Sequence, residues 1–346
     1  MIFFLYYKKT LSKLTKKYNK NILLTGGAGY IGSTVAHDLI KTGHKVTIID
    51  NLSTGYKNLI PSKAEFFKAD INDHQILKRI IKSKKFDLIM HFAAFVKVDE
   101  SVKKPKKYFY NNYDKTKSFL NCCFELGLNK VIFSSTASVY GNIKKKVKEK
   151  DKLIPNNPYA LSKMKCEKFI LDASHKKKCK FVILRYFNVA GSPQNLKTGL
   201  ITKKATHLIK KLCEFILRKK GTFNIYGNNY PTRDGTAIRD FIHVSDLSKL
   251  HMLSMNYLLR YNKSQIFNCG YGKEHSVLEI VKSALKNSKK KLQFNFSKRR
   301  KGDVGYAVAD NSKIKKYLKF KPKFNDIDLI IKSALKWEKK VLYKNY

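Results

Sequence analysis

Two residues four positions apart, Tyr159 and Lys163, could act together as an acid–base pair. Pro158 stands directly before the tyrosine and suits the first turn of a helix, so both side chains should project from one helix face, one turn apart. A free phenol has a pKa of about 10 and is a poor base near neutral pH. A neighbouring ammonium group would favour the phenolate and lower that pKa, which predicts a base that removes a proton from an alcohol.

A predicted strand that ends in hydroxyl groups precedes this pair. Thr136, in the run FSSTASVYG at residues 133–141, could hydrogen-bond both a reacting oxygen and Tyr159, although a threonine there could also simply form a turn. Lysine is so frequent in this chain that the spacing of Tyr159 and Lys163 alone is weak support for a function. Its position behind a glycine-rich turn and the hydroxyl-bearing strand gives it weight.

That glycine-rich turn lies near the start of the chain and is typical of dinucleotide binding. A hydrophobic strand is followed by Gly26, Gly29 and Gly32 and then by an amphipathic helix. Glycines allow the backbone to approach a pyrophosphate, and the helix N-terminus supplies N–H donors. Roughly 20 residues later the next strand ends at Asp50, which could accept hydrogen bonds from ribose hydroxyls and would repel a 2′-phosphate. The pattern favours NAD over NADP.

Two further strand ends fit the same nucleotide. Asp70 follows the third predicted strand and could bond an adenine amino group, or it could instead be the N-cap of the next helix. The fourth predicted strand ends in HFAA, whose small residues would let the backbone pass close beneath a dinucleotide. His91 in this run is interpreted as a packed strand-end residue. The positive ring of an oxidised nicotinamide beside Tyr159 would favour the phenolate further.

Short β-branched runs alternate with helix-like segments from Asn21 to about Ala190, which predicts an α/β fold with a doubly wound, Rossmann-like parallel sheet. Six strands are predicted, in the runs NILLTG, KVTIID, AEFFKAD, FDLIMHFAA, KVIFSS and CKFVILRYF. Beyond Gly191 the pattern loosens into loops, a helix in SVLEIVKSALKNS and a lysine-rich tail. We expect a basic extension at 1–20, a NAD-binding domain at 21–190 and a smaller α/β substrate-binding domain at 191–346, with an interleaved boundary.

The composition is strongly basic, with 72 Lys and Arg against 25 Asp and Glu and a formal net charge of +47 over 346 residues. Nucleic-acid-binding proteins often carry such a charge. Here lysine occurs in every segment, which indicates a compositional bias, and neither a zinc-finger spacing nor an aromatic RNA-binding signature is present. We therefore expect no specific nucleic-acid partner.

Cysteine usage and hydropathy indicate the compartment. Six scattered Cys without a paired CxxC are typical of a reduced, cytoplasmic protein without a metal site. No apolar run is long enough to cross a membrane. In the first 20 residues the basic side chains follow the apolar run and no cleavage site is present, which disfavours a secretory signal and leaves an organelle-targeting role as an alternative.

Taken together, these residues resemble the extended short-chain dehydrogenase/reductases and, within them, the UDP-glucose 4-epimerases. The resemblance runs from about Asn21 into the C-terminal region. Its motifs, in the family's order, are TGGAGYIGS, DNLSTG, HFAAFVKVDESVKKP, FSSTASVYG, PYALSK, LRYFNVAG, THLI, IYGNNYPTRDGTAIRDFIHVSDL and RRKGDVGYAVAD. It implies that Tyr159 takes the proton of a sugar 4-hydroxyl while NAD takes the hydride from C4, and that the hydride returns to the other face of the 4-keto sugar. It also implies a homodimer.

The resemblance places the family's functional roles on matching positions. The implied catalytic residues are Tyr159, Lys163 and Thr136. The implied NAD-binding residues are Gly26, Gly29, Tyr30, Ile31, Gly32, Asp50, Asn51, Asp70, Ile71, Phe92, Ala93, Ala94, Asn111, Tyr159, Lys163 and Phe187. The implied UDP-sugar-binding residues are Thr136, Asn188, Thr206, His207, Arg239, Arg300, Asp303 and Ala307. No metal is implied.

The residue types agree with this assignment in one respect and depart from the family in two. In a chain that uses lysine almost everywhere, Arg239 and Arg300 suggest that a planar fork is needed, as in bidentate phosphate recognition. Thr136 replaces the more common serine but keeps the hydroxyl. Ala307 stands where some epimerases carry a bulky residue that closes the pocket, so UDP-GlcNAc and UDP-GalNAc could also be accepted.

Other functions are compatible with parts of this pattern. A nucleotide-sugar 4,6-dehydratase would carry carboxylates directly after Thr136, where Ala137 and Ser138 stand instead. An epimerase for UDP-xylose or UDP-uronate stays an alternative, because pocket shape distinguishes the sugars. A basic nucleic-acid-binding protein and a NAD-binding regulator without chemistry are alternatives from other classes, and the complete Thr136, Tyr159 and Lys163 set disfavours the regulator.

Overall fold

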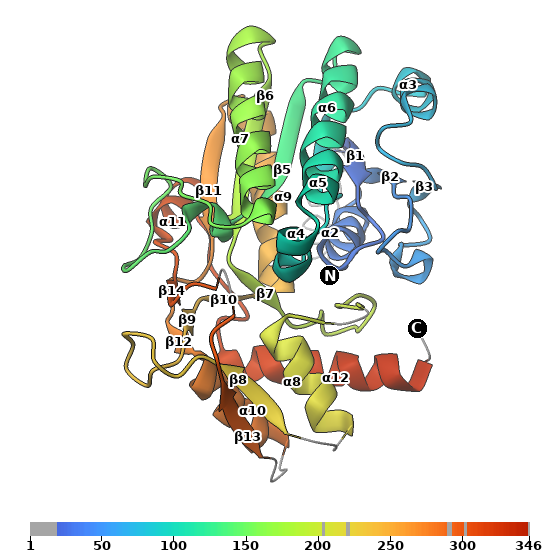
Figure 1. The fold of residues 1–346 in the computed structure, drawn as a ribbon. Coiled ribbons are helices and arrows are strands. Elements are labelled where there is room, and N and C mark those ends of the chain that lie inside the picture. Colours follow the sequence, from blue (N-terminus) through green and yellow to red (C-terminus); the bar gives the residue numbers. More distant parts are fainter. Residues whose placement is uncertain (1–18, 203–204, 219–221, 289–292, 301–302, 345–346) are drawn as a thin grey trace, which may run out of the picture.

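A parallel sheet of seven strands, in the order β11-β6-β5-β4-β1-β2-β3, forms the centre of the molecule. Helices cover both of its faces (Figure 1), which confirms the predicted doubly wound, Rossmann-like class. The predicted basic extension lies outside the described residues, apart from Asn19 and Lys20. The computed structural model describes residues 19–202, 205–218, 222–288, 293–300 and 303–344.

The strands of this sheet are the six predicted from the sequence and one more. Their bounds are β1 (Asn21–Thr25), β2 (Lys45–Ile49), β3 (Glu65–Phe67), β4 (Leu88–His91), β5 (Lys130–Thr136), β6 (Lys180–Tyr186) and β11 (Gln265–Cys269). The additional strand β11 pairs in parallel with β6, from Gln265 beside Val182 to Cys269 beside Tyr186. The sheet therefore takes an edge strand from the segment 191–346.

Both faces of the sheet are buried, as expected when helices cover a parallel sheet on each side. In β1, Ile22 and Leu24 belong to one hydrophobic core and Leu23 to the other, and all three are fully buried. The helices of the first core include α2 (Tyr30–Lys41) and α9 (Val244–Tyr261), and those of the second include α3 (His74–Ser83), α6 (Lys115–Glu125) and α7 (Pro158–Lys176).

Short helices connect the sheet to these layers, and one of them fixes the segment after β4. Their bounds are η1 (Lys57–Leu59), α4 (Val98–Lys103), α5 (Pro105–Tyr108), the π-helix η2 (Phe109–Asp114) and η3 (Ala137–Tyr140). Asn112 of η2 is 1% exposed, and its amide accepts the N–H of Phe95 at 2.8 Å and donates to the carbonyl of Phe95 at 2.9 Å. A π-helical turn is common at functional sites, and here it places Asn112 against the backbone that follows β4.

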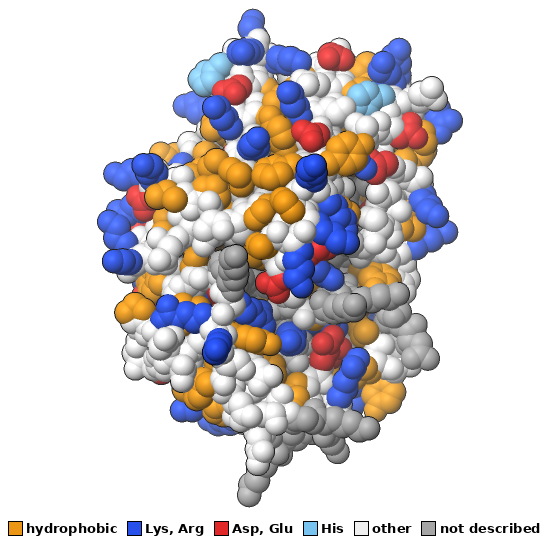
Figure 2. Space-filling model, viewed as in Figure 1, with side chains coloured by type: hydrophobic (Ala, Val, Ile, Leu, Met, Phe, Trp, Pro, Cys, Tyr) orange, Lys and Arg blue, Asp and Glu red, His pale blue; other side chains and the backbone are white. Residues whose placement is uncertain are grey.

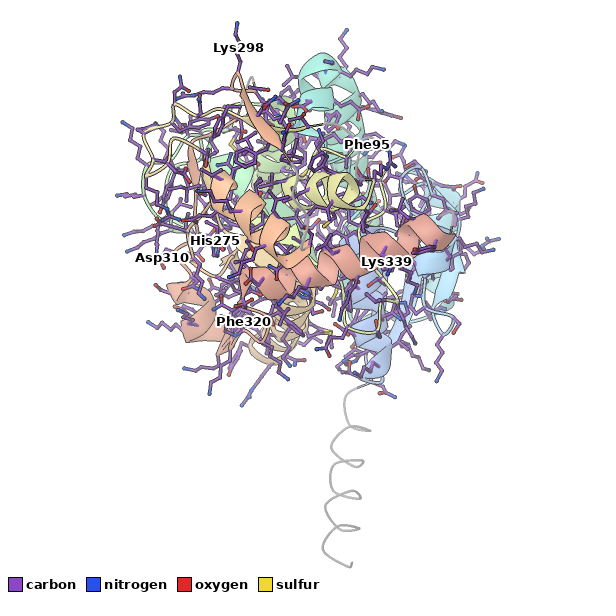
Figure 3. The ribbon with its side chains drawn as sticks, turned by 90° about the horizontal axis from the view of Figure 1, so that it is seen from below. Phe95, His275, Lys298, Asp310, Phe320 and Lys339 are labelled. Atoms are coloured by element: carbon purple, nitrogen blue, oxygen red, sulfur yellow. The ribbon has the colours of Figure 1, made fainter. Side chains whose placement is uncertain are left out.

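A smaller lobe lies at the carboxyl edge of the sheet, below it in Figure 1. Its helices are α8 (Leu208–Arg218), α10 (Val277–Ser288) and α12 (Ile327–Lys344), and α11 (Ser312–Leu318) packs against β11 and α9. Its strands and those that join it to the sheet are β7 (Asn188–Ala190), β8 (Phe223–Tyr226), β9 (Ile238–Arg239), β10 (Phe241–His243), β12 (His275–Ser276), β13 (Phe294–Ser297) and β14 (Tyr306–Ala307). In Figure 3, α12 is the long red helix that bears Lys339, and it packs against α8 and α10.

The distribution of charged and sulfur-bearing side chains bears on the sequence predictions. Lysine and arginine are spread over the face seen in Figure 2, with acidic and apolar side chains between them, rather than gathered in one patch. All six cysteines are free thiols and are buried. No helix in the described ranges has the length and apolar character that crossing a bilayer requires.

Candidate active site

One cavity of about 970 Å³ lies where the carboxyl ends of the strands meet the smaller lobe. Ligands of open α/β sheets bind at this edge. Its lining contains every residue that the sequence assigns to catalysis, to NAD or to the UDP-sugar, and both the sheet and the smaller lobe contribute to it. The described residues hold no group of three His, Cys, Asp or Glu side chains that could bind a metal ion.

The glycine-rich turn between β1 and α2 forms one end of the cavity. Gly26 has a φ of +73°, and a Cβ added to it would lie 2.5 Å from the backbone nitrogen of Ala93. A Cβ at Gly32 would lie 2.3 Å from the carbonyl oxygen of Gly26. Gly29 is the N-cap of α2, and no side chain caps the helix there. Glycines thus allow the tight packing of this turn, and the N-terminal amides of α2 stay free of a side-chain cap, which suits a pyrophosphate.

Asp50, at the end of β2, is held beside this turn. One carboxylate oxygen accepts the N–H of Ala28 at 2.9 Å and the other accepts the N–H of Leu52 at 2.8 Å. The side chain is buried, and burial raises the pKa of Asp50 although both backbone hydrogen bonds lower it. The carboxylate is therefore fixed in orientation by the backbone.

Asp70 lines the cavity and is not a helix N-cap. The N-cap of α3 is Asp73, whose carboxylate accepts the N–H of Ile76 at 3.1 Å, so the alternative interpretation of Asp70 is wrong. Asp70 instead accepts hydrogen bonds from Asn51 at 2.9 Å and from the ammonium of Lys115 at 2.7 Å. Burial raises the pKa of Asp70, but its hydrogen bonds, that of Lys115 foremost, outweigh burial and lower it.

Tyr159 and Lys163 lie in the first two turns of α7, as the sequence predicts. Asn157 caps the helix by accepting the N–H of Ala160 at 2.9 Å, and Pro158 occupies its first turn. Lys163 is 3% exposed, and its ammonium donates to the carbonyl oxygen of Ser134 at 2.8 Å. The cap and the proline set the direction of α7, which places both side chains against the end of β5.

The protonation of this pair differs from the sequence expectation in one respect. Burial raises the pKa of Tyr159 to about 12, although a hydrogen bond with Thr136 lowers it. Burial lowers the pKa of Lys163 to about 8, although Cys166 and Glu167 raise it. The expectation of a lowered phenol pKa is thus wrong for the chain without ligands, because desolvation dominates and the ammonium is directed at Ser134.

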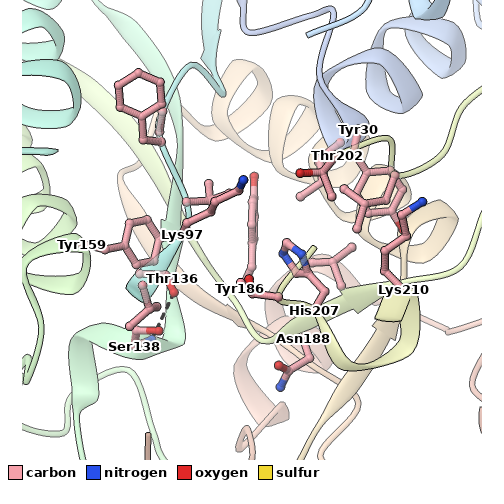
Figure 4. Close-up of a pocket in the computed structure, with 18 of the residues that line it drawn as sticks. Tyr30, Lys97, Thr136, Ser138, Tyr159, Tyr186, Asn188, Thr202, His207 and Lys210 are labelled. Atoms are coloured by element: carbon pink, nitrogen blue, oxygen red, sulfur yellow. Dashed lines mark hydrogen bonds between the residues drawn. The ribbon is translucent and has the colours of Figure 1, made fainter. Parts of the chain in front are cut away.

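Thr136 both forms a turn and interacts with Tyr159. Its hydroxyl accepts the N–H of Ser138 at 3.1 Å and caps η3, as Figure 4 shows, so it forms a turn. The same hydroxyl interacts with Tyr159 and lines the cavity.

His91 is a packed strand-end residue, as predicted. Its ring bonds the hydroxyls of Thr25 at 2.7 Å and Thr116 at 2.9 Å and stacks between Phe119 and Phe133. Burial lowers the pKa of His91 to about 3, so the ring is neutral near pH 7.

The predicted UDP-sugar residues form the other end of the cavity. Arg239 donates to the carboxylate of Asp303 at 2.5 Å and to the carbonyl oxygen of Val304 at 2.7 Å. The guanidinium of Arg300 lies 4.0 Å from the centroid of the Tyr226 ring. Both guanidiniums are thus held in place by protein groups while they line the cavity.

The middle of the cavity is lined from both sides. Figure 4 shows Tyr159 and Thr136 on one side, and His207 and Asn188 on the other. Desolvation in the cavity lowers the pKa of His207, and the ammonium groups of Lys97 and Lys210 lower it further. Asn188, the first residue of β7, donates to the carbonyl oxygen of Asp240 at 3.2 Å.

The sequence reasoning missed several cavity residues. Lys97 and Lys210 line the cavity, but nothing distinguishes them from the many other lysines of the sequence. Tyr186 lines it as well, and its hydroxyl bonds Nε2 of His251 at 2.6 Å, while Nδ1 of that ring bonds the carbonyl oxygen of Leu247 at 2.8 Å. Tyr186 lies at the end of a predicted strand, next to Phe187, an implied NAD-binding residue, and this position could have identified it as a cavity residue.

Comparisons with known proteins agree with this geometry. Residues 22–270 match the family described as NAD dependent epimerase/dehydratase family. The chain is 41% identical to UDP-glucose 4-epimerase of Azospirillum brasilense, over 92% of both chains. A structure of UDP-glucose-4-epimerase from Stenotrophomonas maltophila with bound NAD and formylated UDP-arabinopyranose has a TM-score of 0.90 and 30% identity, covering 94% of this chain and 99% of that one. The UDP-Glc/GlcNAc 4-epimerase of Campylobacter jejuni has a TM-score of 0.81 and 42% identity, covering 93% of this chain and 100% of that one.

The matching segment contains the glycine-rich turn, Asp50, Thr136, Tyr159 and Lys163, and it extends through β11, the edge strand of the sheet. On the length of this match and the identity to the relatives, the chain belongs to the NAD dependent epimerase/dehydratase family.

Proposed function

We propose that this chain is a UDP-sugar 4-epimerase that interconverts UDP-glucose and UDP-galactose with NAD as its cofactor. The observation that carries the proposal is a single cavity that joins the glycine turn to Tyr159 and continues to Arg239 and Arg300. Its volume of about 970 Å³ is near the upper end of the range of ligand sites, as two nucleotides in one cavity require. The names of the relatives given above, UDP-glucose 4-epimerase and UDP-Glc/GlcNAc 4-epimerase, state that they act on UDP-sugars.

The residues at the sheet end fit NAD. Gly26 and Gly32 let the turn pack against the backbone of Ala93 and against itself, and α2 directs its N-terminal amides to where a pyrophosphate would lie. Asp50 would accept the adenosine ribose hydroxyls and Asp70 would face the adenine. The chemistry that NAD supplies when bound is reversible hydride transfer.

Tyr159 would take the proton of the sugar 4-hydroxyl and return it when the sugar is reduced on its other face. Thr136 would hold the reacting oxygen beside the phenol. Lys163 is charged near neutral pH, because its pKa of about 8 lies above that range. Its ammonium would favour the phenolate in the loaded site, and the burial of Tyr159 and Lys163 would keep water from the reacting oxygen.

Arg239 and Arg300 would hold the diphosphate by bidentate hydrogen bonds. Asp303, which already fixes Arg239, would serve the ribose or uracil end. Asn188, Thr206 and His207 would line the path of the sugar.

The experiment that tests this function is incubation of the full chain with UDP-galactose, with and without added NAD, followed by chromatography of the nucleotide sugars. UDP-glucose should accumulate to an equilibrium mixture. Conversion without added NAD would show that the cofactor is retained through purification. Absence of any conversion even with added NAD would contradict the proposal.

We propose that N-acetylated sugars are also accepted. Ala307 of β14 lines the cavity with a small side chain, and the related Campylobacter jejuni protein is named for both UDP-Glc and UDP-GlcNAc. Ala307→Tyr should abolish turnover of UDP-GlcNAc while UDP-galactose still reacts. No reaction of the wild-type chain with UDP-GlcNAc would refute this extension.

We further propose that the chain acts in the cytoplasm as a homodimer that pairs through the helices beside η2. Tyr110 of η2 is 56% exposed. Next to it, the ammonium of Lys165 lies 5.4 Å from the ring centroids of both Phe109 and Tyr113. Sedimentation velocity should give a dimer for the wild-type chain and a monomer for Tyr110→Asp. A monomeric wild-type chain at micromolar concentration would contradict this proposal.

A further inference from the structure

Three consecutive residues at the end of β5 each meet a different partner. The carbonyl oxygen of Ser134 accepts the ammonium of Lys163 at 2.8 Å. The hydroxyl of Ser135 donates to the carboxylate of Glu167, and the hydroxyl of Thr136 interacts with Tyr159. The strand end therefore contacts α7 at several places, and two of these contacts involve residues assigned to catalysis.

Glu167 lies one turn after Lys163 on α7 and is 1% exposed. Its carboxylate also receives Arg185 of β6, with Nη2 to Oε2 at 2.6 Å and Nε to Oε1 at 3.1 Å. Arg185 continues through Nη1 to the hydroxyl of Tyr140 at 2.8 Å and to the carbonyl oxygen of Glu149 at 3.1 Å. A buried carboxylate needs such compensation, and here the fork of Arg185 leaves one oxygen able to accept Ser135 as well.

We propose that Glu167 is a positioning residue for the reaction at Tyr159: through Ser135 it holds the end of β5 against α7, and with its negative charge it supports the ammonium of Lys163. The inference rests on the proposed function. Glu167 is not among the residues that line the cavity, so it acts through Ser135 and Lys163 and not on the substrate.

Several titratable groups surround Lys163, and most of them are neutral near pH 7. On α7, burial raises the pKa values of Tyr159 and Cys166 to about 12. On β4, burial lowers the pKa of His91 to about 3. None of these three side chains carries a charge that could balance the ammonium.

The charged neighbours are Glu167 and, beyond it, Arg185 of β6. Cys166 and Glu167 both raise the pKa of Lys163 against the effect of burial, and of the two only Glu167 is a carboxylate that is bound to a guanidinium. Arg185 is bound to the carboxylate of Glu167, so removing that carboxylate would both take away the attraction and leave the guanidinium uncompensated. The ammonium of Lys163 should then lose its proton at a lower pH.

The test compares Ser135→Ala and Glu167→Gln with a matched control. Ser248→Ala removes the same kind of bond, from a buried serine hydroxyl to the carboxylate of Asp38 at 2.5 Å, but between α9 and α2 and outside the cavity. Each variant is assayed with UDP-galactose for kcat and KM from pH 6 to pH 9. Thermal unfolding and the pH dependence of NAD affinity, measured by calorimetry, are recorded for the same proteins.

Ser135→Ala should lower kcat about tenfold with KM nearly unchanged, because a misplaced catalytic group costs rate rather than ground-state binding. Glu167→Gln should move the alkaline limb of the pH profile to lower pH, so that its loss of kcat is larger at pH 8 than at pH 6. In the same variant, the loss of NAD affinity with rising pH should begin at a lower pH than in the wild-type chain. Ser248→Ala should keep the wild-type kcat and pH profile.

An unchanged kcat in Ser135→Ala would overturn the inference. Losses of kcat that are equal at every pH and that parallel the loss of thermal stability would also overturn it, since they would indicate a purely structural bond. If Glu167→Gln does not fold because Arg185 is left unpaired, Ser135→Ala decides, because it keeps the ion pair. A wild-type chain without epimerisation would refute the proposed function, whereas the pH dependence of NAD affinity would still report on Glu167.

Discussion

At Tyr159 two physical effects oppose each other. Burial favours the neutral phenol and raises its pKa to about 12, whereas catalysis needs a group that accepts a proton near neutral pH. In the chain without ligands the ammonium of Lys163 is directed at the carbonyl oxygen of Ser134. The phenol should therefore keep its proton in the chain without ligands, and the positive charge of a bound cofactor beside it would confine the basic form to the loaded site.

Substitution of the phenol isolates this contribution. Tyr159→Phe should lower kcat for UDP-galactose at least about 100-fold, the lower limit expected for loss of an acid–base group. NAD and UDP should still bind, because the ring remains and only the hydroxyl is lost. Steady-state kinetics and calorimetric titration with UDP check both statements. Near-normal turnover would remove Tyr159 from the mechanism.

The pKa of Lys163 predicts opposite pH dependences for activity and stability. Burial lowers this pKa from 10.5 to about 8, so the ammonium that supports Tyr159 is lost as pH rises through about 8, and kcat should fall there. Between pH 8 and 10.5 the unfolded chain holds a proton on this lysine that the folded chain has lost, so this group makes folding more favourable as pH rises. Measuring kcat and the free energy of unfolding from pH 7 to pH 10 would check both signs. Lys163→Met should lack this contribution to the stability, and an identical pH dependence of stability in that variant would contradict the assignment.

At the scale of elements, the strands with continuous apolar runs could be predicted, and the pairing of distant segments could not. β1 to β6 are short runs rich in apolar and β-branched residues with helical segments or turns between them, and these runs identify all six. β11 has only the short run QIFNC, and its neighbour in the sheet, β6, lies far away in the sequence. Its place at the sheet edge is decided by tertiary packing of Phe267 and α9, which local patterns do not contain.

The site was predictable to a similar extent. Motifs identify residues whose type is special, such as the glycines, Asp50 and Tyr159, and the structure places these on one cavity. Lys115 and Lys97 are ordinary lysines in the sequence, and only the fold brings the first to Asp70 and the second to the cavity. In the chain without ligands the phenol pKa differs from the expectation, because the sequence gives the spacing of two groups but not their burial.

The glycine turn offers a matched test at this scale. Gly26 and Gly127 both have positive φ, +73° and +79°, but a Cβ would meet the backbone of Ala93 only at Gly26 and nothing at Gly127. Gly127→Ala should cost about 1 kcal/mol of stability through left-handed backbone strain alone. Gly26→Ala should cost more and should weaken NAD binding at least about tenfold, since the added methyl group would push the turn away from the backbone of Ala93 and displace the amides that would face the pyrophosphate. Equal NAD affinity in the two variants, measured by calorimetry, would contradict this role of the turn.

At the scale of the whole molecule, the two predicted domains interleave. β11 and α9 come from the segment assigned to substrate binding, yet they complete the sheet and one of its cores. Leu247 and Leu250 of α9 and Phe267 of β11 are fully buried there. A boundary at 190 therefore does not separate two independently packed bodies.

A truncation tests this arrangement. The segment 1–190 should fail to unfold cooperatively on heating and should bind a hydrophobic dye, because the core side that α9 and β11 cover would be exposed. The full chain keeps both elements and everything that packs on them, so it serves as the control, for which a cooperative transition is expected. Thermal circular dichroism decides between the two outcomes. A sharp transition for 1–190 would show that the sheet is complete without β11.

The burial of all six thiols gives the molecule an internal reporter of opening. They are distributed over α6, α7, the approach to β6, α8 and β11, so both lobes contain at least one. A small alkylating reagent can reach such a sulfur only when its surroundings separate. Mass spectrometry of the alkylated peptides would therefore rank the regions by how often each loosens in the native ensemble. Nucleotides that join the lobes should slow alkylation of Cys213 more than that of Cys179, since Cys213 lies in the cavity wall and Cys179 does not.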